Sequence, residues 1–369
     1  MGQVSRKLKK YIFGIVLGIA LMCGTKSYAQ YNREYFFWVG RSCMMNNDYQ
    51  EAIRTLNTLL RFDEDAFEGY FLRGIAKYNL DDLLGAEADF STAIRLNPVY
   101  TQAYTYRAIT RSRLGNYDDA LQDFREAIDL RPDLPGPYYS RGVTRLLNQQ
   151  FKEAIDDFDK FIRQENKVAD AFICRGLSYL HLKDTVRAYD NFNTAIRTNR
   201  ENPSGYNRRG GLYMEQKRFA EAEADFNKAI ECDSAYLLSY FNRALVYSGT
   251  NRPMLALADF DKVIQLDSTN SLTYFNRAML RTQIGDYNRA LDDYDKVALY
   301  SPNNVLVYYN RAGVYAQLGK LEKAVADYSS AIKLYPDFAN AYIYRSRLRE
   351  LLRDPQGAKK DLSLIHISE

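Results

Sequence analysis

The sequence predicts an all-α protein built as a solenoid of tandem helix–turn–helix units. Three observations support this prediction: residue columns recur every 34 positions, the spacing inside each unit follows the α-helical period, and turn residues separate the helical runs. The chain has 369 residues, more than one compact core usually contains. Its 46% hydrophobic and 26% charged residues are ordinary for a folded, water-exposed protein.

Five columns of residues define the 34-residue unit. Arg recurs at a constant interval, with an aromatic residue three positions before it and a small residue directly after it. Ala stands thirteen positions after each Arg, and in most units Phe or Tyr follows that Ala by four positions. The Arg column consists of Arg73, Arg107, Arg141, Arg175, Arg209, Arg243, Arg277, Arg311 and Arg345.

Within a unit, steps of three and four place the column residues on one helix face, as in Tyr104, Arg107 and Ala108. Turns are expected around Gly115, Gly285 and Gly319. Pro253 and Pro355 fall where second helices would begin, a position that tolerates Pro. Pro98, Pro132, Pro302 and Pro336 stand where units would end. Each unit is therefore predicted to be a helical hairpin.

The small residues predict close packing between the two helices of a hairpin. Gly costs about 1 kcal/mol relative to Ala inside a helix, so Gly74, Gly142, Gly176 and Gly210 need a packing reason. We expect this Gly or Ala to face the Ala column of the second helix, while the aromatic columns fill the seam between hairpins.

This pattern resembles the tetratricopeptide repeat (TPR) family over residues 33 to about 361. The resemblance implies a right-handed superhelix, a concave groove lined by first helices, and a binding role without catalysis. The units within the array 30–361 are 33–66, 67–100, 101–134, 135–168, 169–202, 203–236, 237–270, 271–304, 305–338 and a partial unit 339–361.

The Arg column departs from the family pattern, which usually has Leu there. An acid stands sixteen positions after each Arg, except that Asn191 follows Arg175. In unit 33–66 both charges are missing, with Val39 and Thr55 at the two positions. Because an unpaired buried charge is costly, we interpret the columns as structural ion pairs, each preferably within one unit. The alternative is a row of Arg that binds acidic ligands. The predicted pairs are Arg107–Asp123, Arg141–Asp157, Arg209–Asp225, Arg243–Asp259, Arg277–Asp293 and Arg311–Asp327.

By analogy with the family, an apolar and aromatic groove is expected to bind peptide segments or partner proteins. The alternative is that these side chains mostly bury one another between adjacent first helices. The Lys that chaperone-binding relatives use to hold a carboxylate is missing from the corresponding positions. The candidate groove residues are Phe71, Tyr139, Phe241, Phe275, Met279 and Tyr309.

Residues 1–29 have the features of a signal peptide. Basic residues from Arg6 to Lys10 precede the apolar stretch 11–24, and Ser27 and Ala29 fit a cleavage site before Gln30. An uncleaved membrane anchor and a lipid anchor on Cys23 are the alternatives. The expected location is therefore the periplasm or envelope of a bacterium, or its exterior, with no membrane span after cleavage. An odd number of Cys in the mature chain argues against a disulfide framework.

Residues 362–369 (LSLIHISE) resemble a translated sequencing adapter rather than native sequence. We therefore expect the native gene to continue beyond Asp361.

The composition leaves little room for catalysis or for nucleic-acid binding. Residues 1–29 hold five of the 50 basic residues and none of the 46 acidic ones, so the rest of the chain is electrically balanced. Only His181 and His366 carry imidazoles, and phosphate-loop, zinc-protease and serine-hydrolase motifs are missing. We expect no catalytic residues, cofactor or metal, and a non-catalytic interaction scaffold outside the cytoplasm. The alternative is the recognition arm of a larger enzyme or signalling protein. The oligomeric state stays open.

Overall fold

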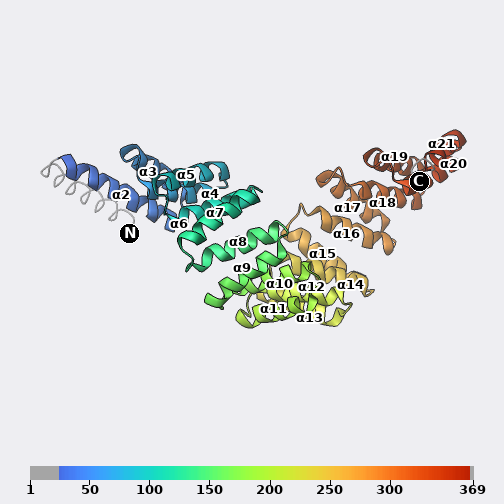
Figure 1. Cartoon of the computed structure of the whole chain (residues 1–369). Helices are drawn as coiled ribbons and strands as arrows, with labels where there is room; N and C mark the ends of the chain where they lie inside the picture. The colour runs from blue at the N-terminus through green and yellow to red at the C-terminus, as the bar shows by residue number, and fades with distance from the viewer. Residues whose placement is uncertain (1–24, 366–369) are drawn as a thin grey trace, which may run out of the picture. The chain divides into compact units, whose positions relative to one another are not determined.

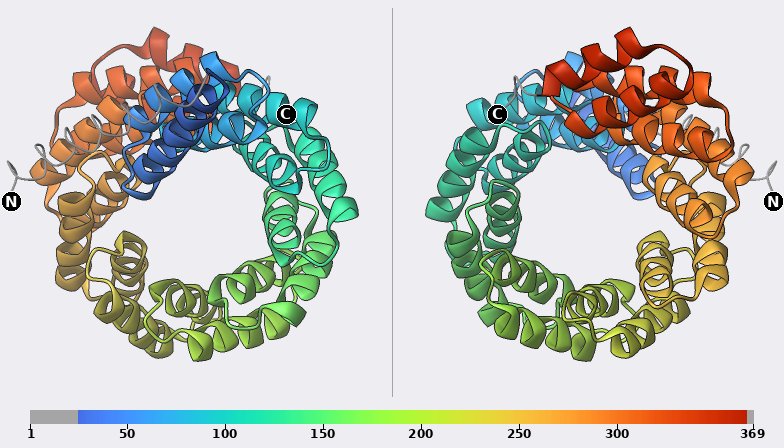
Figure 2. Two further views of the ribbon diagram at one scale, coloured as in Figure 1. Left: turned by 90° about the vertical axis from the view of Figure 1, so that its left-hand side faces the viewer. Right: turned by 90° about the vertical axis from the view of Figure 1, so that its right-hand side faces the viewer.

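The computed structural model describes residues 25–365, and every regular element in that range is an α-helix. The chain divides into two units, residues 1–191 and 192–369, with the boundary inside helix α11 (Thr185–Thr198). Within each unit, consecutive helical hairpins lie side by side along the chain (Figures 1 and 2). The prediction of an all-α solenoid of tandem helix–turn–helix repeats is confirmed.

Even-numbered helices are the first helices of the repeats, and odd-numbered helices are the second. Most first helices pack on the second helix of their own repeat, and most second helices pack in turn on the first helix of the next. Unit 1 contains α2 (Thr25–Met45), α3 (Tyr49–Phe62), α4 (Phe67–Asn79), α5 (Leu83–Leu96), α6 (Thr101–Arg113), α7 (Tyr117–Leu130), α8 (Pro135–Leu147), α9 (Phe151–Gln164) and α10 (Ala169–His181). Unit 2 contains α12 (Pro203–Glu215), α13 (Phe219–Cys232), α14 (Leu237–Gly249), α15 (Pro253–Leu266), α16 (Ser271–Gln283), α17 (Tyr287–Tyr300), α18 (Val305–Gln317), α19 (Leu321–Leu334), α20 (Ala339–Leu351) and α21 (Pro355–Ile365).

The interior of each hairpin is built from the Ala and aromatic columns of the second helix. Ala120 and Phe124 of α7 are fully buried, as are Ala256 and its neighbour Phe260 in α15. Small side chains let the two helices approach, and the ring one turn later fills the space between them. This alternation repeats in every hairpin from α5 to α19.

The small residue of the first helix has a different neighbour from the one predicted. A Cβ added to Gly74 would lie 2.7 Å from Cε1 of Phe90, and one added to Gly210 would lie 2.8 Å from Cε1 of Phe226. Gly therefore makes room for the aromatic ring of its own second helix, and that ring, rather than the predicted Ala, supplies the nearest atoms. The aromatic side chain is longer than that of Ala, so it extends across the space between the two helices of the hairpin and contacts the first helix.

Every hairpin turns through one residue with a positive φ. The predicted turns at Gly115, Gly285 and Gly319 are confirmed, with φ of 81°, 82° and 69°. In the other repeats the same position holds a residue with a Cβ, which a left-handed backbone disfavours. These residues are Asn47, Asp81, Gln149, Lys183, Lys217, Asn251 and Arg353.

The two ends of the chain reach the limits of the described range. The predicted signal peptide lies mostly outside that range, and α2 begins at Thr25, before the predicted cleavage position. At the other end α21 continues to Ile365, so it includes the first residues of the predicted adapter-derived tail. Asp361 is 1% exposed, whereas Leu362 is 42% exposed, so the interior of the last hairpin ends at Asp361.

Candidate functional site

The Arg column forms paired contacts inside each repeat. Arg209 donates from Nε to Oδ2 of Asp225 at 2.7 Å and from Nη2 to Oδ1 at 2.6 Å, which is the bidentate geometry that suits guanidinium and carboxylate. Asp225 is 5% exposed. The structure brings together the two members of every predicted pair in the same way, always within one repeat: Arg107–Asp123, Arg141–Asp157, Arg209–Asp225, Arg243–Asp259, Arg277–Asp293 and Arg311–Asp327.

The remaining guanidinium nitrogen, Nη1, links most of these Arg residues to the preceding repeat. Nη1 of Arg243 donates to Oδ1 of Asn227 at 2.5 Å, and Nη1 of Arg311 donates to Oδ1 of Asp295 at 2.6 Å. The acceptor always stands sixteen positions before the Arg, a regularity that is visible in the sequence but is not part of the predicted pairs. The acceptors are Asn57, Ser91, Asp159, Asn193, Asn227, Asp261, Asp295 and Ser329.

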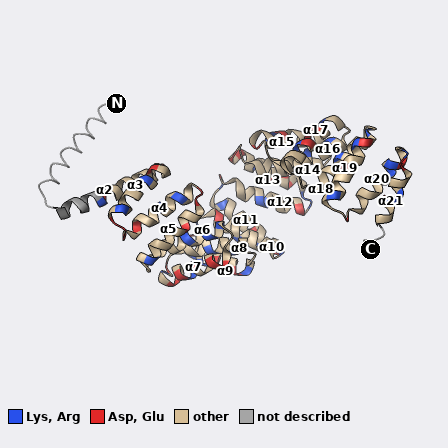
Figure 3. Ribbon diagram, turned by 90° about the horizontal axis from the view of Figure 1, so that it is seen from above, with Lys and Arg blue, Asp and Glu red and all other residues tan. Residues whose placement is uncertain are grey.

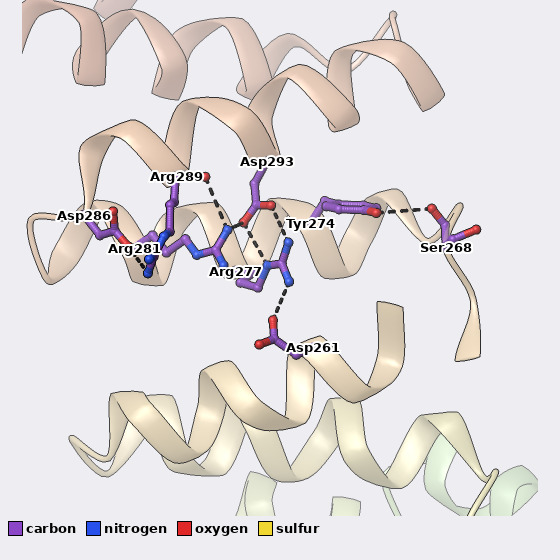
Figure 4. A network of polar contacts seen from close by, with 8 residues as sticks. All are labelled: Asp261, Ser268, Tyr274, Arg277, Arg281, Asp286, Arg289 and Asp293. Atoms are coloured by element: carbon purple, nitrogen blue, oxygen red, sulfur yellow. Dashed lines mark hydrogen bonds and ion pairs between the residues drawn. The ribbon is translucent and has the colours of Figure 1, made fainter. Parts of the chain in front are cut away.

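A second residue, four positions after the Arg, completes the surroundings of the carboxylate. Figure 4 shows this network around Asp293, where Nη1 of Arg281 donates to Oδ2 at 2.7 Å beside the contacts of Arg277. In other repeats the corresponding residue is Tyr, as with Tyr315, whose ring lies 6.0 Å from the Arg311 guanidinium carbon. The hydrogen bond to Asp327 raises the pKa of Arg311 and favours its charged form.

Repeat 169–202 balances its Arg differently. Nε of Arg175 donates to Oδ1 of Asn191 at 2.8 Å, so the partner within the repeat carries no charge. The ion pair is formed instead with Asp159 of the preceding repeat. The column thus keeps a carboxylate beside Arg175, although it comes from the other side.

These contacts make the Arg column part of the interior. The side chain of Arg141 is 10% exposed and that of Asp157 is 1% exposed. Figure 3 shows basic and acidic residues interspersed along the helices of both units. The geometry therefore favours the structural interpretation of the Arg column over the binding of acidic ligands.

The predicted groove residues fall into two groups. Phe71 is 6% exposed and packs against Phe90, Tyr100 and Tyr106, so it belongs to the interior and offers no open surface. This burial corrects the expectation for Phe71. Met279, in contrast, is 48% exposed on α16.

The other four predicted groove residues lie between these extremes. They are partly exposed, and each ring packs on an aromatic residue of its own second helix, with ring centroids 5.6 to 6.1 Å apart. Burial raises the pKa of both Tyr139 and Tyr309. The four residues are Tyr139 in unit 1 and Phe241, Phe275 and Tyr309 in unit 2.

A pocket of about 340 Å³ opens on the first helices of unit 2. Its floor is apolar, with Leu245, Phe260 and Tyr294, and its rim carries the amides of Asn276 and Asn310. An apolar floor with a few polar groups is the usual composition of a binding pocket. Ser248, Met279, Leu280, Thr282 and Gln283 complete the lining.

His181 has a packing role at the end of α10. Its ring stacks on that of Phe151, with centroids 4.5 Å apart and planes 2° apart. In residues 25–365 no group of three or more His, Cys, Asp or Glu side chains is placed to hold a metal ion. The same part of the chain contains no helix with the length and apolar character required to cross a bilayer.

Sequence comparisons agree with the repeat geometry. Models described as tetratricopeptide repeat or TPR repeat match residues 111–149, 203–236, 272–304 and 305–338. A model of anaphase-promoting complex subunit 5 matches residues 138–205. No curated protein matches the chain significantly.

Several solved structures share the fold. A tetratricopeptide repeat protein from Parabacteroides merdae is 20% identical with a TM-score of 0.53, and the alignment covers 65% of this chain and 95% of that one. Pseudomonas aeruginosa pilF is 20% identical with a TM-score of 0.52, over 58% of this chain and 97% of that one. A monomeric mutant of IFIT1, solved with Gppp-AAAA, is 10% identical with a TM-score of 0.52, over 90% and 89%. At these identities the similarity concerns the fold alone.

The hairpins, their constant register and their mutual packing define an α-helical repeat protein of the solenoid class. The chain belongs to the tetratricopeptide repeat family. Such repeats generally act as non-catalytic scaffolds that bind other proteins or peptides.

Proposed function

We propose that this protein is a non-catalytic scaffold that works outside the cytoplasm and binds a polypeptide segment on the first-helix face of unit 2. The observation that carries the proposal is the 340 Å³ pocket, whose lining comes mainly from α14, α16 and α18. A concave site with apolar floor and polar rim can enclose part of a ligand and orient it.

The surroundings of the pocket favour a polypeptide over a small anionic ligand. The guanidinium groups of Arg243, Arg277 and Arg311 are held inside the repeats by their Asp partners. The pocket itself is lined by neutral side chains, including Ser248 and Gln283. Neutral amides and hydroxyls next to apolar surface match the mixed character of a peptide chain.

The location outside the cytoplasm is proposed from the first 29 residues. A basic segment, an apolar stretch and small residues before Gln30 together form the pattern of a secretory signal.

Site-specific photo-crosslinking tests the binding face. A photoreactive amino acid replaces Met279 at the pocket or, as the matched control, Leu299 on α17, which is 67% exposed and outside the pocket lining. Both full-length variants are produced in the organism that carries the gene and are irradiated there. We expect a polypeptide adduct from position 279 and none from position 299. Adducts of equal yield at both positions, or none at position 279, would contradict the proposal.

A further inference from the structure

We propose that α14, α16 and α18 together hold an extended peptide segment that has no charged side chains. This inference rests on the polypeptide binding proposed above and adds the chemistry and the length of the ligand. Its basis is a surface that occurs in nearly the same form in three consecutive repeats of unit 2, which we call the neutral face.

The neutral face begins with three exposed Leu residues in register. Leu238, Leu272 and Leu306 are 45%, 58% and 50% exposed, and each is the second residue of its helix. Leu that stays exposed at the same position of three successive first helices is a repeated apolar feature, which differs from isolated apolar residues scattered over a surface.

One helical turn after each Leu stands an Asn. Asn242, Asn276 and Asn310 follow the three Leu residues by four positions, so they lie on the same face of their helices. Nδ2 of Asn276 donates to the backbone oxygen of Leu272 at 2.8 Å, which shows that the two residues are stacked along the helix. An Asn side chain has both a donor and an acceptor, the two groups with which a backbone peptide unit can pair.

The neutral face continues with Leu245 and Met279, seven positions after Leu238 and Leu272. Met279 is 48% exposed and lines the pocket together with Leu245 and the amides of Asn276 and Asn310. A peptide that pairs with the two amides would therefore direct a side chain toward an apolar floor. Met adapts its shape to such side chains more readily than branched residues do.

Charged residues limit the neutral face at both ends. Among the equivalent positions, α12 holds Arg208 where the three helices have Asn, and α20 holds Arg347 where α14 and α16 have Leu245 and Met279; both Arg residues are exposed. Between these limits, the three helices have no Lys, Arg, Asp or Glu at the positions that share this face. A charged ligand side chain would lose hydration against this face without gaining an opposite charge, and that transfer is costly.

The spacing of the helices sets the length of the segment. The three first helices line one pocket, and α16 contacts α18; at the usual spacing of about 10 Å for helices in contact, they span at least about 20 Å from α14 to α18. An extended chain advances about 3.3 Å per residue, so at least about six residues cross the neutral face. We therefore expect one apolar anchor for every three residues or so.

A displayed library of random heptapeptides, panned on the full-length protein, tests the proposal. We expect enrichment of peptides that have no charge over their central residues and apolar residues about three apart. Binding of an enriched peptide is then measured for Leu272→Glu and for the matched variant Leu299→Glu, which alters an exposed Leu outside the neutral face. Leu272→Glu should weaken binding at least tenfold, and Leu299→Glu should leave it unchanged. Asn276→Ala, which removes only an amide, should also weaken binding and gives a second measurement if Leu272→Glu lowers stability.

Other outcomes would overturn the proposal. Enrichment of charged peptides, or binding that Leu272→Glu and Asn276→Ala both leave intact, would place the ligand elsewhere while polypeptide binding itself stands. Failure to enrich any peptide would also overturn it, and crosslinking at position 279 then decides separately whether the protein binds polypeptides. A concentration-dependent dimer that Leu272→Glu abolishes would identify a second copy of this chain as the occupant.

Discussion

Arg209 and Asp225 face each other across one hairpin, joined by two hydrogen bonds of 2.7 and 2.6 Å. Their side chains are 21% and 7% exposed, so the ion pair is largely withdrawn from water. The attraction between two such groups offsets the cost of their burial only while both are present. The pair therefore fixes the fit between α12 and α13 more than it adds to stability.

Breaking this pair from one side should cost more than removing it. Arg209→Leu is expected to lower the free energy of unfolding by about 3–5 kcal/mol, because it leaves Asp225 buried beside an apolar side chain. Arg209→Leu combined with Asp225→Leu should restore much of that loss. Chemical denaturation of the wild type, both single variants and the double variant measures the coupling.

A coupling energy near zero would refute the structural interpretation of the Arg column. The exposed pair Arg131 and Asp133 serves as the control for this cycle, since surface ion pairs contribute little.

Substitution at the hairpin turns should have opposite effects in different repeats. Lys217 adopts a φ of 60°, which disfavours any residue with a Cβ, so Lys217→Gly should raise stability by up to about 1 kcal/mol. Gly285→Ala should lower it by about 1 kcal/mol, although a Cβ there would meet no other atom within 4 Å. Thermal unfolding monitored by circular dichroism measures both changes. If both variants changed the stability in the same direction, side-chain contacts rather than backbone conformation would determine the effect.

The protein should lose stability in strong alkali, partly through Tyr294. Burial raises the pKa of Tyr294 to about 12, whereas an unfolded chain ionises near its ordinary value of 10. Between pH 10 and 12 the unfolded state therefore binds fewer protons than the folded state, and unfolding becomes easier as pH rises. Over this pH interval, Tyr294 lowers the free energy of unfolding by about 3 kcal/mol.

Tyr294→Phe should reduce this alkaline loss, because Phe fills the same position in α5, α7, α9, α13 and α15. Denaturation midpoints of wild type and variant at pH 8 and pH 11 provide the comparison. An identical drop in both proteins would assign the alkaline loss to other groups, such as Tyr100, whose pKa burial also raises to about 12.

The mature protein should begin at Gln30. Intact-mass measurement and N-terminal sequencing of the protein recovered from its native host test the predicted cleavage after Ala29. Replacing Ala29 with Tyr, a residue too large for that position, should cause the precursor to accumulate. Recovery of a chain that still starts at Met1 would contradict cleavage and favour a retained anchor.

Much of the fold followed from the period of the sequence. The Arg, Ala and aromatic columns predicted two helices per unit, and helix starts such as Pro253 and Pro355 were predicted correctly. The packing of the Phe90 ring against Gly74 was not predicted. Residue spacing shows which face of a helix a side chain occupies, but it does not show how far a large ring extends toward the next helix. The left-handed residue of the other seven turns was also not predicted, since Lys183 and Arg353 give no local signal for such a backbone.

The candidate site was predictable only in part. Pairs such as Arg243 and Asp259 were visible from charge complementarity at a fixed spacing. Phe71 was misplaced because exposure depends on neighbours from other repeats, such as Tyr100 and Tyr106, whose rings cover it. The neutral face was missed for a related reason: the row of Leu at 238, 272 and 306 becomes meaningful only once those side chains are known to be exposed.

The link from each Arg to the repeat before it has a consequence for how such a chain can change in length. Arg277 now reaches back to Asp261, and Arg243 to Asn227. If residues 237–270 were deleted as a block, Arg277 would stand sixteen positions after Asn227. Asn227 already accepts a hydrogen bond from Arg243 at that spacing. Whole-unit duplication or loss therefore preserves the chain of contacts, whereas an insertion of one residue interrupts it. The molecule is in this sense modular, and it can lengthen or shorten by gene segments of about 102 nucleotides, which encode the 34 residues of one unit.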